Sequence, residues 1–242
     1  MAFFYLLLML TACAAGPQDM CGKMLVFPEE TSTASVRLIT SQPSFSSVTV
    51  CLRSITDLSR THALFSVSTS SADNAFLIFK VAASDEIQLH VDNKWKGFGA
   101  LDYKLNAWQS ICSTWDSASG LGQLWLDGKP TIKKFLGGSK IINPITILGQ
   151  EQDSHGGGFD LKQSFVGMMS DVHMWNYVLS PCEIQNYVDD LNFTPGNLIN
   201  WSALVNTTTG RVLIENKQTG CCMNMKCKRP VDVRSGQKKS QA

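Results

Sequence analysis

The stretch WQSICSTWDSASGLGQLWLDG, residues 108–128, shows how this chain of 242 residues is built. It contains two short β-rich runs, residues 108–114 and 122–126, separated by polar and small residues. Asp127-Gly128 follows the second run directly, and a type I′ hairpin turn needs two such residues that tolerate positive φ. The stretch therefore predicts short strands that are joined by tight turns.

Runs of the same kind recur along the chain between turn-forming residues. They span residues 35–39, 48–52, 63–67, 75–81, 87–91, 144–148 and 166–178. Regular short strands with polar turns are typical of an antiparallel sandwich of two sheets. The fold class that the sequence predicts is therefore all-β.

One segment, residues 180–190, has the pattern of a helix instead. Ser180 stands at the N-cap, Pro181 at the first helical position, and Glu183 three residues after the cap, which together predict a capping box. Ile184, Tyr187 and Val188 fall on one face of this helix. We expect that face to dock on a sheet.

The two ends of the chain differ from the middle. Residues 1–16 hold an apolar run that is followed by small residues, as in a secretory signal peptide, so we expect a secreted, extracellular protein. No later stretch approaches the roughly 20 apolar residues of a membrane helix. Residues 219–242 are rich in Lys and Arg and predict a disordered basic tail, either merely solvated or bound to an anionic surface. The net charge of +1 gives no reason to expect specific nucleic-acid binding.

Secretion would make disulfides and glycans available to this chain. Cys51 and Cys112 each lie in an apolar strand-like run and are the best candidates for a pair within the domain. The pairing of the other cysteines of the mature chain stays open, and their odd total suggests a free thiol or a link between chains. These are Cys21, Cys182, Cys221, Cys222 and Cys227. Glycosylation sequons begin at Asn192, Asn200 and Asn206, and Asn192 and Asn206 are the favoured acceptors.

The glycine-rich segment of residues 149–163 has the composition of a loop that wraps a hard cation. It supplies the carboxylates of Glu151, Asp153 and Asp160 together with several amide oxygens. Calcium takes six to eight oxygen ligands of these kinds. A second acidic and amide pair, Asp73-Asn74, precedes the apolar run of residues 75–79. The alternative is that such residues gather here because loops are polar and turn-forming.

Residues 110–117, Ser-Ile-Cys-Ser-Thr-Trp-Asp-Ser, resemble the pentraxin signature H-x-C-x-[ST]-W-x-[ST] at every fixed position except the first, where Ser110 replaces His. Residues 72–74, 149–163, 174–175 and 178–181 follow in the order and spacing of that family. The resemblance covers residues 24–218. It is greatest to the short members, of the C-reactive protein and serum amyloid P type.

The resemblance implies a flattened jelly roll with one helix on one face, and a cyclic pentamer that carries its calcium sites on the other face. It implies two calcium ions per subunit. The first would be held by Asp73, Asn74, Glu151, the Gln152 carbonyl and Asp153, and the second by Glu151, Asp153, Asp160 and Gln163. Asp160 stands where the family commonly has Glu, so its shorter side chain predicts a weaker second site.

The implied function is capture of phosphocholine-like or other anionic groups on microbes and damaged membranes. Phe79 matches the apolar residue beneath the choline methyl groups, and Glu86 approximately matches the acid that faces the quaternary nitrogen. Asp127 and Tyr187 match positions on the opposite face, where the complement first component or Fc receptors engage. Innate immunity is thus the expected setting, and no chemistry on the ligand is required.

Three other functions compete with this interpretation. A lectin of the same architecture would use the calcium face to bind vicinal hydroxyls or carboxylates of a carbohydrate. A jelly-roll glycosidase would need a further carboxylate shortly after Glu151-Gln152-Asp153, where residues 154–157 offer none. A disulfide-linked interaction protein, built on Cys21 and Cys182, is a third alternative. The sequence favours a binding protein over an enzyme.

Overall fold

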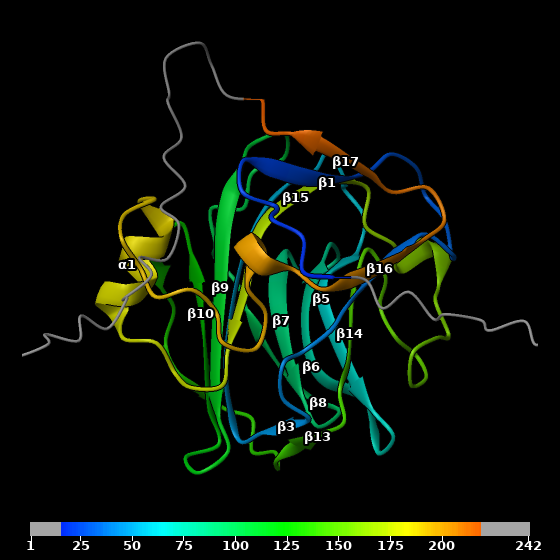
Figure 1. The fold of residues 1–242 in the computed structure, drawn as a ribbon. Coiled ribbons are helices and arrows are strands. Elements are labelled where there is room, and N and C mark those ends of the chain that lie inside the picture. The colour runs from blue at the N-terminus through cyan, green and yellow to red at the C-terminus, as the bar shows by residue number, and fades with distance from the viewer. Residues whose placement is uncertain (1–15, 219–242) are drawn as a thin grey trace, which may run out of the picture.

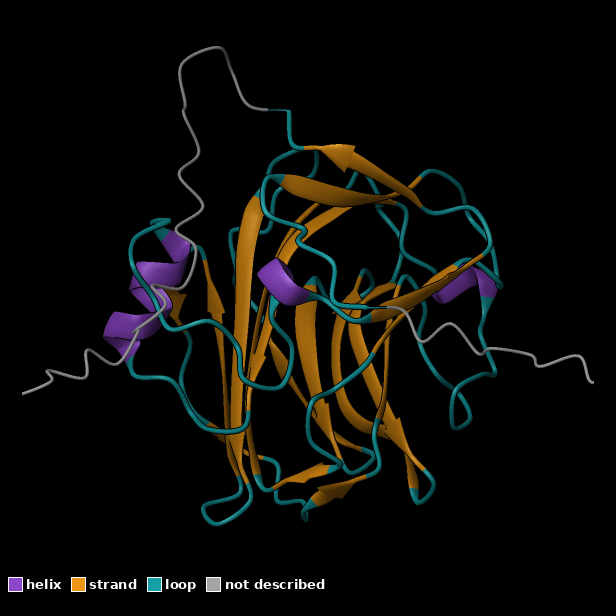
Figure 2. Ribbon diagram, viewed as in Figure 1, coloured by secondary structure: helices purple, strands orange, loops and turns teal. Residues whose placement is uncertain are grey.

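The computed structural model describes residues 16–218 as two antiparallel sheets packed face to face, with one α-helix on an outer side (Figures 1 and 2). The predicted signal peptide lies outside the described residues except for Gly16. The predicted basic tail, with Cys221, Cys222 and Cys227, lies outside them entirely.

The first sheet has seven strands, and its outer side carries the glycine-rich loop of residues 149–163. Neighbouring strands pair antiparallel throughout this sheet. In spatial order the strands are β16 (Asn206–Thr209), β2 (Ser35–Leu38), β14 (Ile145–Leu148), β5 (His62–Thr69), β6 (Ala72–Val81), β7 (Glu86–Val91) and β8 (Lys94–Phe98).

The second sheet has eight strands, and its outer side carries the helix. Its order is β11 (Lys129–Pro130), β10 (Leu121–Leu126), β9 (Gln109–Asp116), β4 (Ser47–Ile55), β15 (Gly167–Trp175), β1 (Lys23–Phe27) and β17 (Leu213–Asn216), with β12 (Lys134–Phe135) paired to β10. A two-stranded ribbon of β3 (Ser44–Phe45) and β13 (Ile141–Ile142) lies apart from both sheets. The helical elements are α1 (Pro181–Val188) and two 3-10 turns, η1 (Leu161–Gln163) and η2 (Trp201–Ala203).

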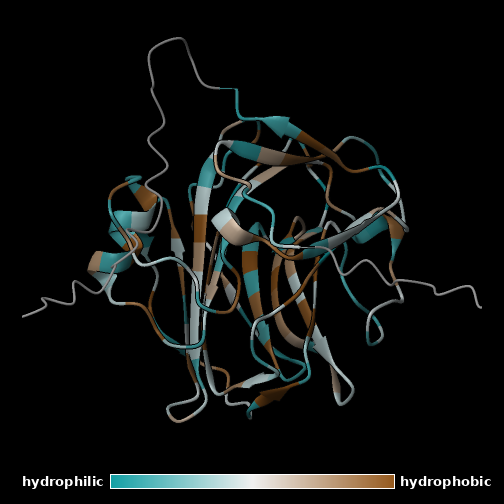
Figure 3. Ribbon diagram, viewed as in Figure 1, coloured by the Kyte–Doolittle hydropathy of each residue, from teal (hydrophilic) through white to brown (hydrophobic). Residues whose placement is uncertain are grey.

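The main core fills the space between the sheets. In β7 the burial alternates, because Ile87, Leu89 and Val91 point inward and the residues between them are only partly covered (Figure 3). Period-two alternation of this kind is what a sheet with one buried face requires. The residues that alternate outward from the seven-stranded sheet are therefore free to form a site.

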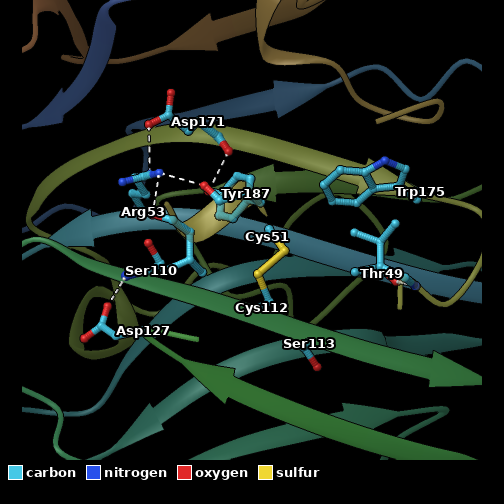
Figure 4. The surroundings of a disulfide bond; sticks show 12 residues. Thr49, Cys51, Arg53, Ser110, Cys112, Ser113, Asp127, Asp171, Trp175 and Tyr187 are labelled. Atoms are coloured by element: carbon cyan, nitrogen blue, oxygen red, sulfur yellow. Dashed lines mark hydrogen bonds and ion pairs between the residues drawn. A yellow bond between two sulfur atoms is a disulfide. The ribbon is translucent and has the colours of Figure 1, made fainter. Parts of the chain in front are cut away.

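A second, smaller core lies between α1 and the outer side of the eight-stranded sheet. It contains Ile184 and Tyr187 of the helix, Trp175 of β15, and the disulfide between Cys51 and Cys112 (Figure 4). Cys51 and Cys112 face each other directly in the β4–β9 register, so the predicted pair is confirmed. The predicted docking face of the helix is confirmed as well.

Two local predictions on turns and caps have different outcomes. Asp127 and Gly128 have φ of 47° and 77°, as the predicted hairpin turn requires. Ser180 Oγ accepts from the Glu183 backbone N–H, which is the first half of the capping box. The second half does not form, because the Glu183 carboxylate accepts instead from the N–H of Thr194.

The structure corrects one strand boundary and describes two cysteines whose pairing the sequence left open. The strand predicted over residues 166–178 ends at Trp175, because the next N–H, that of Asn176, binds the side chain of Asn197 instead of a neighbouring strand. Cys21, for which the sequence suggested no partner, is disulfide-bonded. Cys182 is an exposed free thiol at the start of α1.

Among the predicted glycan acceptors, Asn192 is exposed, whereas Asn200 and Asn206 are half-buried. The Asn200 side chain accepts from the N–H of Ser202 and caps η2. Their occupancy remains a prediction.

Candidate functional site

The candidate loop, residues 149–163, leaves the end of β14 and folds over the outer side of the seven-stranded sheet. Its base is closed by a hydrogen bond from the Phe165 N–H to the Gly149 carbonyl, 2.9 Å. Gly158 has φ of 72°, and a Cβ built there would lie 3.0 Å from the backbone of Asp153. A residue with a side chain would hold the two arms of the loop apart, so Gly158 allows the loop to close on itself.

Gln152 fixes the middle of the loop to the sheet. Its amide nitrogen donates to the Ser66 and Ile145 carbonyls, and its amide oxygen accepts from the Ser68 hydroxyl at 2.7 Å. The Gln152 side chain is fully buried by these contacts. Its main chain is therefore held in one position, which suits the sequence prediction that Gln152 acts through its carbonyl.

Arg60 holds the far end of the loop. Its guanidinium donates to the carbonyls of Lys162 and Ser164, at 3.0 and 2.6 Å. Asp160 caps the 3-10 turn η1, because its carboxylate accepts from the Lys162 N–H at 2.9 Å. The loop is thus anchored at its base, middle and end before any ligand is considered.

The structure brings four of the predicted ligands into one electrostatic neighbourhood. Burial is the largest cause that raises the pKa of Glu151, to about 7, and the carboxylates of Asp153 and Asp73 raise it further. A hydrogen bond from Asn74 acts in the opposite direction. Asp73 and Asn74 of β6 and Asp153 of the loop therefore all act on Glu151, so the two segments lie near each other.

Buried oxygens without donors identify what this neighbourhood lacks. Apart from Thr146 Oγ1, the buried side-chain oxygens of residues 16–218 that have no hydrogen-bond partner all belong to Asn74, Gln150, Glu151 and Gln163. Leaving such an acceptor unpaired costs about 1–3 kcal/mol each. Buried oxygens without donors in the loop and at the start of β6 are what a hard cation would satisfy, so the residues fit calcium.

The carboxylates alone do not enclose an ion. Within residues 16–218 no three His, Cys, Asp or Glu side chains converge closely enough to hold a metal by themselves. A site here would therefore use amide and main-chain oxygens beside its acids. Calcium accepts that mixture, whereas zinc prefers nitrogen and sulfur ligands.

An aromatic platform extends from the site across β6, β7 and β8. We define it as Phe79, His90 and Trp95, whose rings contact in sequence at centroid distances of 6.0 and 6.4 Å. Burial lowers the pKa of His90 to about 4, so its imidazole is neutral at pH 7. Trp95 is 53% exposed, which leaves much of its indole open to a ligand.

Sequence reasoning missed His90 and Trp95. The pattern that could have found them is the turn Asp92-Asn93, whose two positive φ values place His90 opposite Trp95 in the hairpin. Alternation along β7 then puts His90 on the same side as Glu86.

Glu86 lies farther from the loop than Phe79 does. Along β6, His90 pairs with Leu77 on the loop side of Phe79, and Glu86 pairs with Val81 beyond it. The Glu86 carboxylate accepts from Gln88 at 2.7 Å. The Glu86 carboxylate also lies against Gly97: a Cβ built at Gly97 would be 1.9 Å from Glu86 Oε2. A ligand role for Glu86 remains a prediction.

The residues predicted for the opposite face differ in exposure. Asp127 is exposed, although its carboxylate accepts from the N–H of Ser110 at 2.7 Å. Tyr187 is 1% exposed, and its hydroxyl donates to the Asp171 carbonyl (Figure 4). Tyr187 therefore supports α1 from beneath and offers no contact surface to a partner, contrary to its assignment from sequence.

Together the sandwich and its oxygen-rich loop define a β-sandwich binding protein whose candidate site suits a hard cation. No helix within residues 16–218 is long and apolar enough to cross a membrane. The model of the Pentaxin family matches residues 23–216, and the chain belongs to this family, the pentraxins. Its two-sheet fold is accordingly a jelly-roll sandwich.

Individual relatives agree with this assignment. Serum amyloid P-component of Sus scrofa is 38% identical over 218 residues, which cover 87% of this chain and 96% of that protein. C-reactive protein of Rattus norvegicus is 40% identical over 215 residues, covering 86% and 92%. The heptameric SAP-like pentraxin of Limulus polyphemus has a TM-score of 0.74 at 24% identity, covers 83% of this chain and 97% of that one, and supports the fold.

Pentraxins are non-enzymatic recognition proteins of innate immunity that bind calcium, and this chain shares that class. The glycosidase alternative is thereby excluded.

Proposed function

We propose that this chain is a secreted protein that captures phosphocholine-like and other anionic groups on microbes and damaged membranes in a calcium-dependent way. The observation that carries the proposal is the group of buried, unpaired oxygens on Asn74, Glu151 and Gln163, together with an aromatic platform whose Phe79 lies on the same strand as Asn74. One end of the site suits a cation that would bind phosphate, and the other suits an apolar or cationic group.

Two calcium ions per subunit are proposed. Asp73, Asn74, Glu151, Asp153 and the Gln152 carbonyl would hold the first. Glu151, Asp153, Asp160 and Gln163 would hold the second. When bound, the ions supply positive charge and open coordination positions that accept oxygens of an anionic ligand. The protein's own contribution is to fix these oxygens through the anchors at Gln152 and Arg60.

The aromatic platform would receive the part of the ligand that projects from the phosphate. The Gln88 amide donates to Glu86, so its oxygen is left to accept from His90 Nε2 at 3.1 Å. This contact fixes the neutral tautomer of His90 with its Nδ1 unprotonated. A neutral ring beside Phe79 and Trp95 does not repel a quaternary ammonium group, which aromatic faces attract.

Assembly and partners extend the proposal. A cyclic pentamer would present all calcium faces to one surface and convert weak single-site contacts into avidity. The complement first component or Fc receptors would then engage the opposite face, around exposed Asp127. A calcium-dependent carbohydrate-binding lectin is the second candidate, which the exposed indole of Trp95 favours.

The test is binding of the purified mature protein to immobilised phosphocholine, first with calcium and then with a chelator. We expect binding that the chelator reverses and that free phosphocholine competes better than phosphoethanolamine. Phe79→Ala should weaken capture about tenfold, because a buried aromatic contact is lost while the calcium ligands stay. Absence of binding in calcium would contradict the proposal, and competition by neutral sugars alone would favour the lectin.

A further inference from the structure

A cleft of about 490 Å³ lies beside the candidate loop and away from the aromatic platform. Its walls are the β2–β3 connection, residues 40–43, and the β13–β14 connection around Asn143, and His155 of the loop also lines it. In the sheet order, β2 and β14 lie on one side of β5, and β6 to β8 lie on the other. The cleft therefore lies on the other side of β5 from Phe79.

The walls of the cleft are fixed by hydrogen bonds. The N–H of Asn143 donates to the Pro43 carbonyl at 2.7 Å and joins the two connections. Thr40 Oγ1 donates to the Gln42 carbonyl, and the Gln42 amide oxygen accepts from Asn176 at 3.0 Å. A cleft with walls held in this way is formed before a ligand arrives, which lowers the entropic cost of binding.

Arg37 is the charged group of the cleft, and it is unpaired. It lies on β2 between Ile147 of β14 and Thr207 of β16, and it is exposed. Arg53 and Arg60 each form an ion pair, but the Arg37 side chain makes neither an ion pair nor a hydrogen bond within residues 16–218. No Asp or Glu lines the cleft. A guanidinium without a counter-ion there suits a carboxylate or sulfate, which it can bind with two parallel hydrogen bonds.

The rest of the lining indicates what carries that anion. Hydroxyl and amide side chains alternate with the apolar surfaces of Pro43, Pro144 and Ile145, and the lining contains no Phe, Tyr or Trp. The volume is within the range of about 300–1,000 Å³ that is usual for small-ligand sites. Hydroxyl groups and the apolar faces of a sugar ring match this lining.

We propose that the Arg37 cleft binds an acidic saccharide, with Arg37 on the carboxylate or sulfate and residues 40–43 and Asn143 on the sugar. The site goes beyond the proposed capture of phosphocholine-like groups and needs no calcium, because no acid lies in it to bind a cation. The cleft adjoins the candidate loop, because His155 of the loop lines it. The next residue, Gly156, packs against Ile145 of the cleft: a Cβ built at Gly156 would lie 3.0 Å from the Ile145 side chain. One polysaccharide could thus contact both sites.

The experiment measures binding of the full chain to a chondroitin tetrasaccharide and to its sulfated form, in chelator, by calorimetry. Two-dimensional NMR locates the site through shifts at Arg37 and residues 40–43. We expect Arg37→Gln to weaken binding about tenfold or more for whichever of the two tetrasaccharides binds more tightly to the wild type, since a charge-assisted contact is lost. Arg37→Lys should fall between, because it keeps the charge and loses the planar fork.

Arg211→Gln is the matched control, since Arg211 is exposed, lies outside the cleft and carries the same charge. It should change the affinity less than about twofold if the contact is local rather than a general charge effect. Equal loss in Arg37→Gln and Arg211→Gln, or no loss in Arg37→Gln, would overturn the proposal. So would the absence of shifts around Arg37.

This result is separable from the proposed function. Arg37→Gln should still capture phosphocholine in calcium, and Glu151→Gln should still bind the tetrasaccharide in chelator. If the wild type failed to capture phosphocholine but bound the tetrasaccharide through Arg37, the proposed function would fail and the saccharide site would stand.

Discussion

The two outer sides of this sandwich differ in whether their buried polar groups have partners. Under α1, Arg53 lies between Asp171 and Asp190, at 3.3 and 2.7 Å, and Lys217 also pairs with Asp171. Over the seven-stranded sheet, Asn74, Glu151 and Gln163 each bury an oxygen that has no donor. Paired charges hold an element in place, whereas unpaired oxygens are a cost that a ligand can offset. The comparison separates a supporting side from a binding side.

The two sides also differ in what positions them. The helix side is joined by the Cys51–Cys112 disulfide and by rings of His173, Trp175 and Tyr187 in mutual contact. Burial lowers the pKa of His173 to about 4, so its imidazole is neutral at pH 7. The loop side rests on hydrogen bonds from single side chains, chiefly Gln152 and Arg60.

The largest effect should follow from removing the disulfide with the double variant Cys51→Ala/Cys112→Ala. Its cysteines are 61 residues apart, and loss of such a link costs about 2–5 kcal/mol of unfolding free energy. Denaturant unfolding measures that loss. Calcium affinity of the folded fraction should stay within about twofold of the wild type, because the loop has its own anchors. A folded variant that no longer bound calcium would contradict the view that the disulfide side and the loop side act independently.

Glu151→Gln should have the opposite profile. A neutral amide cannot replace a carboxylate shared by two cations, so calcium affinity should fall about a hundredfold or more. The variant should fold normally in chelator, because it removes a buried charge beside Asp153 and Asp73. Calorimetric calcium titration and thermal unfolding check the two halves. Calcium-dependent capture retained by a folded Glu151→Gln protein would contradict our assignment of the site.

A smaller effect should come from pH. With the pKa of Glu151 raised to about 7, protons compete with calcium, and lowering the pH from 8 to 6 should weaken calcium binding about tenfold. Without calcium, the free energy of unfolding should depend on pH in the opposite direction, with the fold more stable at low pH. The stabilisation from protonated Glu151 is fully present below about pH 4.5 and is lost as the pH rises through about 7. Calcium binding that did not vary between pH 6 and 8 would count against a buried Glu151 carboxylate in the site.

The sequence predicted many of the strands that carry an apolar or alternating run, and it missed several others. Residues 87–91 were recognised because Ile87, Leu89 and Val91 alternate with polar residues. The edge strands β8 and β16 were missed, because Lys-Trp-Lys-Gly-Phe and Asn-Thr-Thr-Thr carry little apolar periodicity. Edge strands bury little on either face, so composition gives only a weak signal for them.

The same limit applies to the site. The oxygen-rich loop was visible in the composition of residues 149–163, and Asp73-Asn74 was visible as an acidic and amide pair at the start of an apolar run. His90 and Trp95 were not visible, because their position beside Phe79 depends on the register of β6, β7 and β8. Cross-strand register is set by turns and burial together. The anchoring role of Gln152 likewise depends on contacts with Ser66 and Ser68 that are 84 residues or more distant along the chain.

The most direct test of the difference between the two sides is hydrogen–deuterium exchange with calcium and with chelator. We predict that calcium slows exchange in residues 149–163 and at the start of β6 around Asn74, because bound oxygens would hold both segments. Exchange in α1 should not change, since its ion pairs and ring contacts involve none of the proposed calcium ligands. An unchanged loop, or protection that appeared at α1 instead, would contradict the assignment of the binding side.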